Sequence, residues 1–191
     1  MIEQTLVLLK PDAVQRALVG EILSRFERPG FKIVALKMCY ATKDLAGRHY
    51  ADDEAWLNSV GEKMKKAYEA KGQKIAESSK AIGQRVRQQL MDFITMSPTV
   101  AVVLEGHDVI NKVRTVVGDT APSKAAPGTI RGDYSFDSYG LADVSGRPIQ
   151  NLIHASDSVE SAKREMAIWF MKDEIHPYQR VDEALLYRKG K

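Results

Sequence analysis

Short runs of consecutive apolar residues, separated by stretches with a helical pattern, constrain this chain most strongly. Thr5–Leu9 (TLVLL) and Thr99–Leu104 (TVAVVL) are unbroken runs, and Phe31–Tyr40 is rich in Ile, Val and Leu. A continuous run of this length is typical of a strand that is covered on both faces. Asn151–His154 is a shorter candidate of the same kind. We therefore expect four strands that form one sheet.

The first interval between these runs has a clear helical pattern. Pro11 ends the first strand, Asp12 is the candidate cap, and a helix is expected over Ala13–Arg28, until Pro29-Gly30 ends it. One face of this helix carries apolar residues at every fourth position: Val14, Leu18, Ile22 and Phe26.

Further helices follow the other strands. The pattern predicts them over Lys43–Tyr50, Ile82–Ile94 and His107–Val117. A last helix runs to Phe170, with Ser156 or Asp157 as its cap, and Asp157 and Glu160 are spaced as a capping box.

This order of elements, β-α-β-α-β-α-β-α, predicts the fold class. It fits an α+β fold, the ferredoxin-like sandwich, in which helices pack on one side of a four-stranded antiparallel sheet. A doubly wound parallel sheet is the alternative. The short strands and the lack of a glycine-rich first turn make that alternative the less favoured one.

The length of 191 residues predicts a single domain over 1–191 with insertions. The segment at about 51–90 is densely charged and reads as an exposed helical excursion before a packed helix. A second extra segment, at about 136–150, has little predicted structure. Between the third and fourth strands, Asp119–Ser135 is expected to be a long irregular loop, and loops of that length are often functional.

Composition excludes few classes of protein, but it indicates in which compartment the protein acts. The net charge of +3 is too small to indicate nucleic-acid binding. A single cysteine, no signal-peptide pattern and no apolar run of membrane length predict a cytoplasmic protein. The sequence contains no P-loop, no dinucleotide-binding glycine motif and no Cys/His cluster with zinc spacing, so no metal ligand is assigned.

His154 is the candidate nucleophile. It lies where a short strand meets the start of a helix, near free backbone N–H groups that favour anions. Glu165 falls at the edge of the apolar face of that helix. If its carboxylate accepts a hydrogen bond from one imidazole nitrogen, the other nitrogen is unprotonated, as a nucleophile requires. The alternatives are a histidine satisfied by its backbone neighbours and a boundary glutamate paired with a lysine.

Cations and polar residues adjoin the same elements. Lys10 follows the first strand, Arg114 lies within a predicted helix, and Arg131 lies in the long loop. A phosphate site needs several cations that converge. Each of these three residues, taken alone, is more often a solvated surface charge. Thr120 and Asn151 are polar residues beside them. The other histidines are scattered and receive no role: His49, His107 and His176.

Four separated motifs, in the same order, resemble the nucleoside diphosphate kinase family. They are TLVLLKPDAVQR at 5–16, the triplet RHY at 48–50, the block from Pro98 to Asp133, and NLIHASDSVESAKREMAIWF at 151–170. The last resembles the family's active-site signature around its histidine. The resemblance extends from Thr5 to Phe170 and implies a ferredoxin-like fold.

The resemblance also implies an activity. His154 would carry the phosphate that a ping-pong reaction moves from a nucleoside triphosphate, typically ATP, to nucleoside diphosphates. Glu165 and Ser156 would orient it. Six residues would surround the phosphates and ribose: Lys10, Tyr50, Arg114, Thr120, Arg131 and Asn151. Mg²⁺ would bridge the nucleotide phosphates, and the protein would be a hexamer or a tetramer.

The chain departs from the family pattern in its two enlarged segments. They blur the position of the aromatic residue on which the family stacks the base. Trp56, Leu57 or an aliphatic residue are the candidates. Two rival functions remain at this point: a catalytically inactive nucleotide-binding regulatory protein of the same fold, and a nucleic-acid-binding protein. The strands lack the clustered aromatic residues that the second rival needs.

Overall fold

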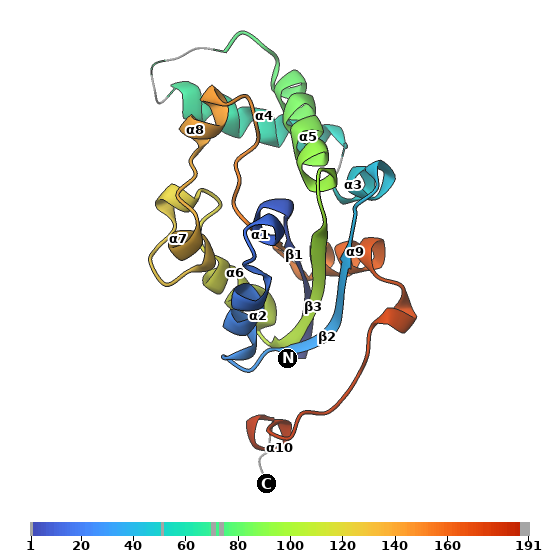
Figure 1. Cartoon of the computed structure of the whole chain (residues 1–191). Helices are drawn as coiled ribbons and strands as arrows, with labels where there is room; N and C mark the ends of the chain where they lie inside the picture. The colour runs from blue at the N-terminus through green and yellow to red at the C-terminus, as the bar shows by residue number, and fades with distance from the viewer. Residues whose placement is uncertain (1, 51, 70–71, 73–74, 188–191) are drawn as a thin grey trace.

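A computed structural model describes residues 2–50, 52–69, 72 and 75–187 of the chain (Figure 1). Its elements in chain order are β1 (Ile2–Leu9), α1 (Pro11–Gln15), α2 (Val19–Glu27), β2 (Lys32–Cys39), α3 (Lys43–His49), α4 (Glu54–Glu69), α5 (Ser79–Thr95), β3 (Thr99–His107), α6 (Val109–Val117), the 3₁₀ turn Pro122–Lys124, α7 (Ile130–Tyr134), α8 (Tyr139–Val144), β4 (Ile153–Ala155), α9 (Val159–Trp169), the 3₁₀ turn Lys172–Glu174 and α10 (Glu183–Leu186).

The four strands form one antiparallel sheet in the order β2-β3-β1-β4. This confirms the ferredoxin-like class and excludes the doubly wound alternative, which needs parallel strands. In the register, Leu8 on the central strand β1 lies between Ala101 of β3 and His154 of β4. The candidate nucleophile therefore lies on the short edge strand β4 and is paired directly with the central strand β1.

Helices cover both faces of the sheet, so the expectation of helices on one side was wrong. Val7 and Leu9 of β1 pack with the apolar residues of α2 and α6, whereas Leu6 and Leu8 pack with α3, α5 and α9. All four side chains are fully buried. A continuous apolar run is typical of a strand that is covered on both faces. Both faces of β1 are therefore buried under helices, and a sheet with helices on one side only does not fit this run.

The single helix expected after β1 is two helices. The chain turns at Ala17, which has a φ of +56°, and α2 begins at Val19. Val14 and Leu18 still pack against the same core as Ile22, so their spacing reports burial on one face rather than a continuous helix. Asp12 does not cap α1. The cap position is Lys10, and Asp12 lies buried in the first turn.

Two other helix starts also differ from expectation. Ser158, rather than Ser156 or Asp157, caps α9, because its hydroxyl accepts from the N–H of Ser161. Ser156 instead donates to Glu165. His107 belongs to the end of β3, and α6 begins at Val109.

The first enlarged segment is a helical hairpin of α4 and α5, which stands at one end of the sheet (Figure 1). The two helices approach closely at Gly61 and Gly83. A side chain on Gly83 would collide with the backbone of Leu57. Residues 70–71 and 73–74 of its charged run lie outside the described residues. The hairpin is thus a packed unit, with α4 as its outer helix.

The other two segments expected to be irregular contain short helices. The loop at 119–135 includes a 3₁₀ turn and α7, and the second insertion includes α8. Asp143 of α8 forms a hydrogen bond with Tyr68 of α4, and Gly146 accepts one from Gln89 of α5. The two insertions therefore meet, although they are far apart in the sequence.

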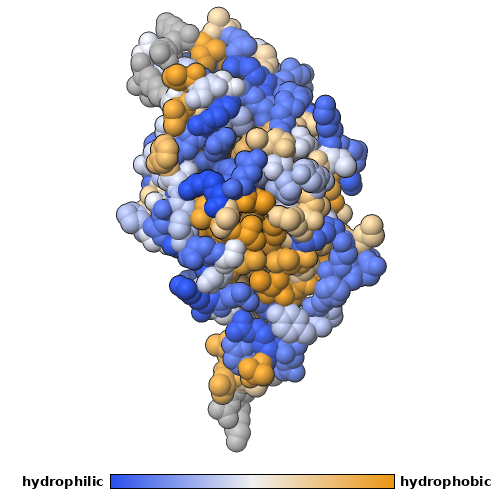
Figure 2. Space-filling model, viewed as in Figure 1, coloured by the Kyte–Doolittle hydropathy of each residue, from blue (hydrophilic) through white to orange (hydrophobic). Residues whose placement is uncertain are grey.

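The C-terminal segment runs past β2, the outer strand of the sheet. The N–H of His176 donates to the carbonyl of Val34, and Lys37 pairs with Glu174. Further along β2, Leu36 and Met38 are about half exposed. Figure 2 shows apolar surface gathered in the middle of this face, over the strands. Among the described helices, none is both long enough and apolar enough to cross a membrane.

Candidate active site

A cavity of about 630 Å³ opens where β1 ends and β4 begins, between α6, α9 and the α4–α5 hairpin. Its volume is in the range of small-molecule sites. Eight of the nine predicted site residues line it: Lys10, Tyr50, Arg114, Thr120, Arg131, Asn151, His154 and Glu165. The ninth, Ser156, is fully buried behind Glu165. The structure thus brings together residues from six separate parts of the chain.

Two hydrogen bonds define the state of His154. Its Nε2 lies 2.9 Å from Oε2 of Glu165, and the hydroxyl of Ser156 donates to the same oxygen over 2.6 Å. Burial raises the pKa of Glu165, but the bonds from His154 and Ser156 outweigh this and lower it to about 2. An ionised Glu165 requires Nε2 to be the protonated nitrogen, and Nδ1 then keeps its lone pair.

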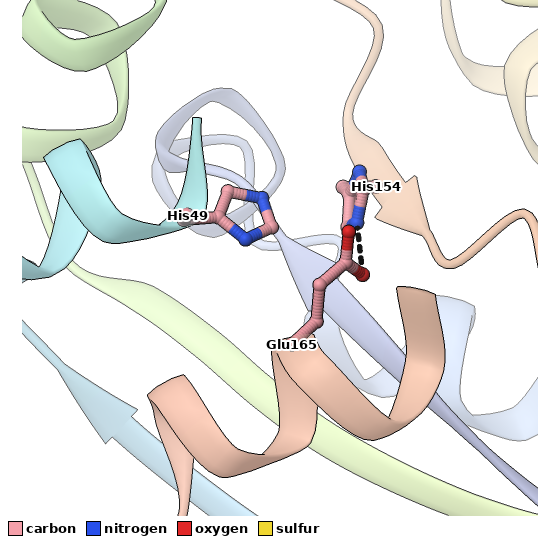
Figure 3. A group of neighbouring side chains, drawn as sticks. All are labelled: His49, His154 and Glu165. Carbon is pink, nitrogen blue, oxygen red and sulfur yellow. Dashed lines mark hydrogen bonds and ion pairs between the residues drawn. The ribbon is translucent and has the colours of Figure 1, made fainter. Parts of the chain in front are cut away.

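His49, which received no role from the sequence, lies directly beside His154, the candidate nucleophile (Figure 3). Its ring contacts that of His154 edge to face, with 4.7 Å between centroids, and its Nδ1 accepts from Nε1 of Trp169. Burial, and then the neighbouring His154, lower the pKa of His49 to about 3, so it is neutral. The triplet RHY contained the signal, because His49 precedes the cavity residue Tyr50.

His49, His154 and Glu165 offer ligand atoms within 4.8 Å of one another, which is close enough to consider a metal ion. Their hydrogen bonds argue against one. The lone pair of His49 Nδ1 is occupied by Trp169, so Nε2 of His49 carries a proton. Glu165 already accepts from both His154 and Ser156. The geometry favours a hydrogen-bonded cluster that orients His154.

Lys10 and Asn151 form the buried part of the cation group. Nζ of Lys10 donates to Oδ1 of Asn151 over 2.7 Å, and Nδ2 of Asn151 donates to the carbonyl of Thr120 over 2.8 Å. Burial, and then the charge of Arg131, lower the pKa of Lys10 to about 8. Lys10 is therefore largely charged at neutral pH, and it keeps two N–H donors for a ligand.

Most of the guanidinium N–H groups of Arg131 donate to the protein backbone. It donates to four carbonyls, those of Gly118, Asp119, Asn151 and Ile153. Of its five N–H donors, one remains for a ligand. Burial, and then the charge of Arg114, lower its pKa to about 10, so it stays charged. Arg131 therefore ties the loop at 118–119 to β4 in addition to lining the cavity.

The remaining predicted residues are less constrained. Arg114 on α6 and Thr120 are exposed at the cavity. Tyr50 is the opposite case, because its hydroxyl is buried and has no hydrogen-bond partner in the described structure. Burial, together with Glu165, raises the pKa of Tyr50, so the hydroxyl remains a neutral donor. An unpartnered buried hydroxyl beside a cavity is available to a ligand.

The first insertion supplies the outer lining of the cavity. Trp56 and Lys63 of α4 and Leu90 of α5 line it, but Leu57 is buried between the two helices. Of the two named candidates for the base-stacking role, Trp56 is therefore the one that faces the cavity. An aromatic face, a lysine and an aliphatic side chain form a surface on which a flat ring can stack.

Comparison with known proteins agrees with this geometry. The family model "Nucleoside diphosphate kinase" matches residues 3–175. A curated nucleoside diphosphate kinase from Pyrobaculum aerophilum is 48% identical over 179 residues, which are 91% of this chain and 98% of that protein. Another from Archaeoglobus fulgidus is 41% identical and covers 98% of this chain and 99% of its own length.

Solved structures match as well. A crystal structure of an NDP kinase from Pyrobaculum aerophilum superposes with a TM-score of 0.89 at 45% identity, and covers 93% of this chain and 100% of its own. A Borrelia burgdorferi nucleoside-diphosphate kinase, solved as a transition state mimic with vanadate and ADP bound, has a TM-score of 0.80 at 38% identity, with 96% of each chain covered. The chain therefore belongs to the nucleoside diphosphate kinase family, a family of phosphotransferase enzymes.

Proposed function

We propose that this chain transfers the γ-phosphate of a nucleoside triphosphate, typically ATP, to nucleoside diphosphates through a phosphohistidine on Nδ1 of His154. The observation that carries the proposal is the hydrogen bond from Nε2 of His154 to Glu165. It leaves Nδ1 unprotonated in a cavity that also holds Lys10, Arg114 and Arg131. Phosphoryl transfer needs an in-line nucleophile and stabilisation of phosphate charge, and this cavity combines them.

The reaction divides into two similar halves. In the first, the lone pair of Nδ1 attacks the γ-phosphorus, the bond to the bridging oxygen breaks, and the diphosphate leaves with that electron pair. The ring keeps its proton on Nε2, and Glu165 stabilises the charge that develops there. In the second half, an oxygen of an acceptor diphosphate attacks phosphorus and the P–N bond breaks. No net proton transfer is needed, since the first half replaces a phosphoanhydride bond with a P–N bond and the second half reverses that exchange.

The other predicted residues are proposed to bind the nucleotide. Lys10 and Arg131 offer their remaining N–H donors to phosphate oxygens, and Arg114 and Thr120 are exposed to do so. Tyr50 and Asn151 complete the phosphate and ribose site. Base stacking is assigned to Trp56. This distribution suits an enzyme that accepts many bases, because Lys10 and Arg131 are buried, whereas Trp56 belongs to the outer lining of the cavity.

Mg²⁺ is proposed to arrive on the nucleotide. The acidic side chains that line the cavity are Asp119, Asp157 and Glu165 in the described residues, and Glu165 is bound to His154. The Oδ1 of Asp119 accepts from the N–H of Ala121. This donor set fits a cation held mainly by phosphate oxygens. When bound, Mg²⁺ neutralises part of the phosphate charge.

The domain, the assembly and the location complete the proposal. We infer one domain over 1–191 with insertions at about 51–90 and 136–150, which acts in the cytoplasm as a homo-oligomer, a hexamer or a tetramer. The half-exposed Leu36 and Met38 on the outer strand β2 support self-association, since exposed apolar patches often mark interfaces. No specific nucleic acid and no membrane is proposed as a partner.

The test is phosphorylation by γ-labelled ATP with Mg²⁺. Wild-type protein is expected to take up acid-labile, alkali-stable label that GDP removes as GTP. His154→Asn is expected to take up none, and His107→Asn, which changes an exposed histidine outside the cavity, is the matched control. Tight ATP binding by the wild type without label would contradict the proposal and favour the inactive regulatory protein.

A further inference from the structure

Asp12 is a buried carboxylate that the phosphotransfer chemistry does not use. It lies in the first turn of α1, two residues after Lys10, and is 7% exposed. Its Oδ2 accepts the N–H of Leu152 over 2.9 Å, and its Oδ1 has no hydrogen-bond partner in the described structure. Burying a carboxylate without full hydrogen bonding lowers the stability of the folded protein. Two features of the structure give a reason why a carboxylate is nevertheless found here.

The first reason is the backbone of Leu152. Its φ of +67° lies in the left-handed region, which a leucine rarely adopts. Both of its backbone polar groups are held by one short segment, since Asp12 accepts its N–H and the N–H of Lys10 donates to its carbonyl over 2.8 Å. Leu152 lies between Asn151 and His154. The turn at Leu152 therefore decides how these two side chains enter the cavity.

The second reason is charge. The charge of Asp12 acts on cations from three elements: Lys10 after β1, Arg131 on α7 and Arg147 after α8. For Lys10, burial and then Arg131 lower the pKa, whereas Asp12 raises it. His49 on α3 is neutral and therefore adds no charge near Lys10. Asp12 is thus the carboxylate that opposes the crowding of positive charge around Lys10.

We propose that Asp12 is a positioning residue for phosphotransfer, which fixes the turn at Leu152 and acts as counter-ion to the buried ammonium of Lys10. It does not touch the substrate. Its hydrogen bond orients Asn151 and His154, and its charge favours the protonated form of Lys10 in the nucleotide-free enzyme, when no phosphate is present to do so. The inference rests on the proposed function, because it assigns these effects to that site.

Two substitutions separate the two effects. Asp12→Asn keeps an oxygen that can accept from Leu152 but removes the charge. The pKa of Lys10 is expected to fall by roughly one unit, a typical effect of losing a nearby opposite charge. The alkaline limb of kcat/KM should move down by the same amount, with kcat at pH 6.5 within about threefold of wild type. Asp12→Ala removes both interactions, and its kcat should fall about tenfold or more, because misplacing the nucleophile slows transfer.

The decisive readout is independent of turnover. NMR titration of the lysine side chains in isotopically labelled, nucleotide-free protein gives the pKa of Lys10 directly, with Lys10→Arg to assign its signal. Asp44→Asn, on the exposed side of α3, is the control and should leave that pKa unchanged. An unchanged Lys10 pKa in folded Asp12→Asn protein would overturn the counter-ion role. A kcat in Asp12→Ala equal to that of wild type would overturn the positioning role.

Failure of the proposed function gives a different result. If wild-type protein takes up no label from ATP, the phosphohistidine mechanism fails, whatever the Lys10 titration shows. If it is labelled normally but the Lys10 pKa is insensitive to Asp12, only the present inference fails. Circular dichroism and thermal melting of each variant establish that the compared proteins are folded.

Discussion

The phosphate end of the cavity and its outer rim are built differently. The phosphate end consists of residues at the end of β1, on or just before β4, and on α7 and α9, which are joined by hydrogen bonds between distant segments: Lys10, Asn151, His154, Arg131 and Glu165. The rim consists of the α4–α5 hairpin, which supplies Trp56, Lys63 and Leu90. The hairpin meets the second insertion through polar contacts such as that between Gln89 and Gly146.

This difference separates chemistry from recognition. Groups that stabilise a transition state must be held within fractions of an ångström, and burial in a hydrogen-bonded network achieves this. Groups that stack a base need only present a surface. We therefore expect substitutions at the phosphate end to lower kcat or kcat/KM strongly, and substitutions at the rim to raise KM moderately.

The largest effect is expected for Glu165→Gln. The amide cannot stabilise positive charge on the ring as a carboxylate does, and it no longer selects the protonated nitrogen. The kcat should fall by roughly 100-fold, the scale of losing one preorganised electrostatic partner. Single-turnover labelling by ATP measures the first half-reaction alone. Glu160→Gln, in the exposed first turn of the same helix, is the control, and an equal loss in both variants would remove the distinction.

The next effect concerns Lys10 and pH. Because the pKa of Lys10 is about 8, the free enzyme loses this charge as the pH rises through 8, and kcat/KM should decline there. Lys10→Gln should lower kcat/KM at pH 7 by about 30-fold, as expected for a charge-assisted phosphate contact, and abolish that decline. Lys112→Gln on the exposed face of α6 should retain it.

The same shift has a consequence for stability. The pKa of Lys10 is lower in the folded protein than its ordinary value of 10.5, so the unfolded chain binds more protons between pH 8 and 10.5. The contribution of Lys10 to the free energy of unfolding therefore rises with pH across that window. Denaturant titrations of wild type and Lys10→Gln at pH 8 and pH 10 would reveal it, and parallel behaviour of the two proteins would argue against a buried, charged Lys10.

The smallest effect is expected at the rim. Trp56→Ala should raise the KM for nucleoside diphosphates by about fivefold, the lower end of the energy of base–aromatic stacking, and leave kcat nearly unchanged. Trp56→Phe keeps an aromatic face and should restore most of the affinity. A large fall in kcat for Trp56→Ala would show that the rim takes part in the chemistry, and the comparison between the two regions would no longer hold.

Local patterns predicted much of the fold because they report burial directly. The apolar runs Thr5–Leu9 and Thr99–Leu104 lie in buried strands, and the resemblance of four motifs to a family is confirmed by the family model and by relatives. The patterns failed where the same spacing of apolar residues fits more than one backbone structure. The four-residue spacing from Val14 to Phe26 describes one buried face equally well in one helix or in two, and only packing decides.

The site shows the same division. Residue types and spacing made His154 a candidate nucleophile and Glu165 its candidate partner, because the chemistry of imidazole and carboxylate is intrinsic to the residues, and the family resemblance then implied their roles. The neutral His49 on Trp169 and the buried Asp12 on the turn at Leu152 depend on contacts across more than a hundred residues. Such contacts arise when strands and helices pack, and a one-dimensional pattern does not encode which distant groups then meet in a region of low dielectric.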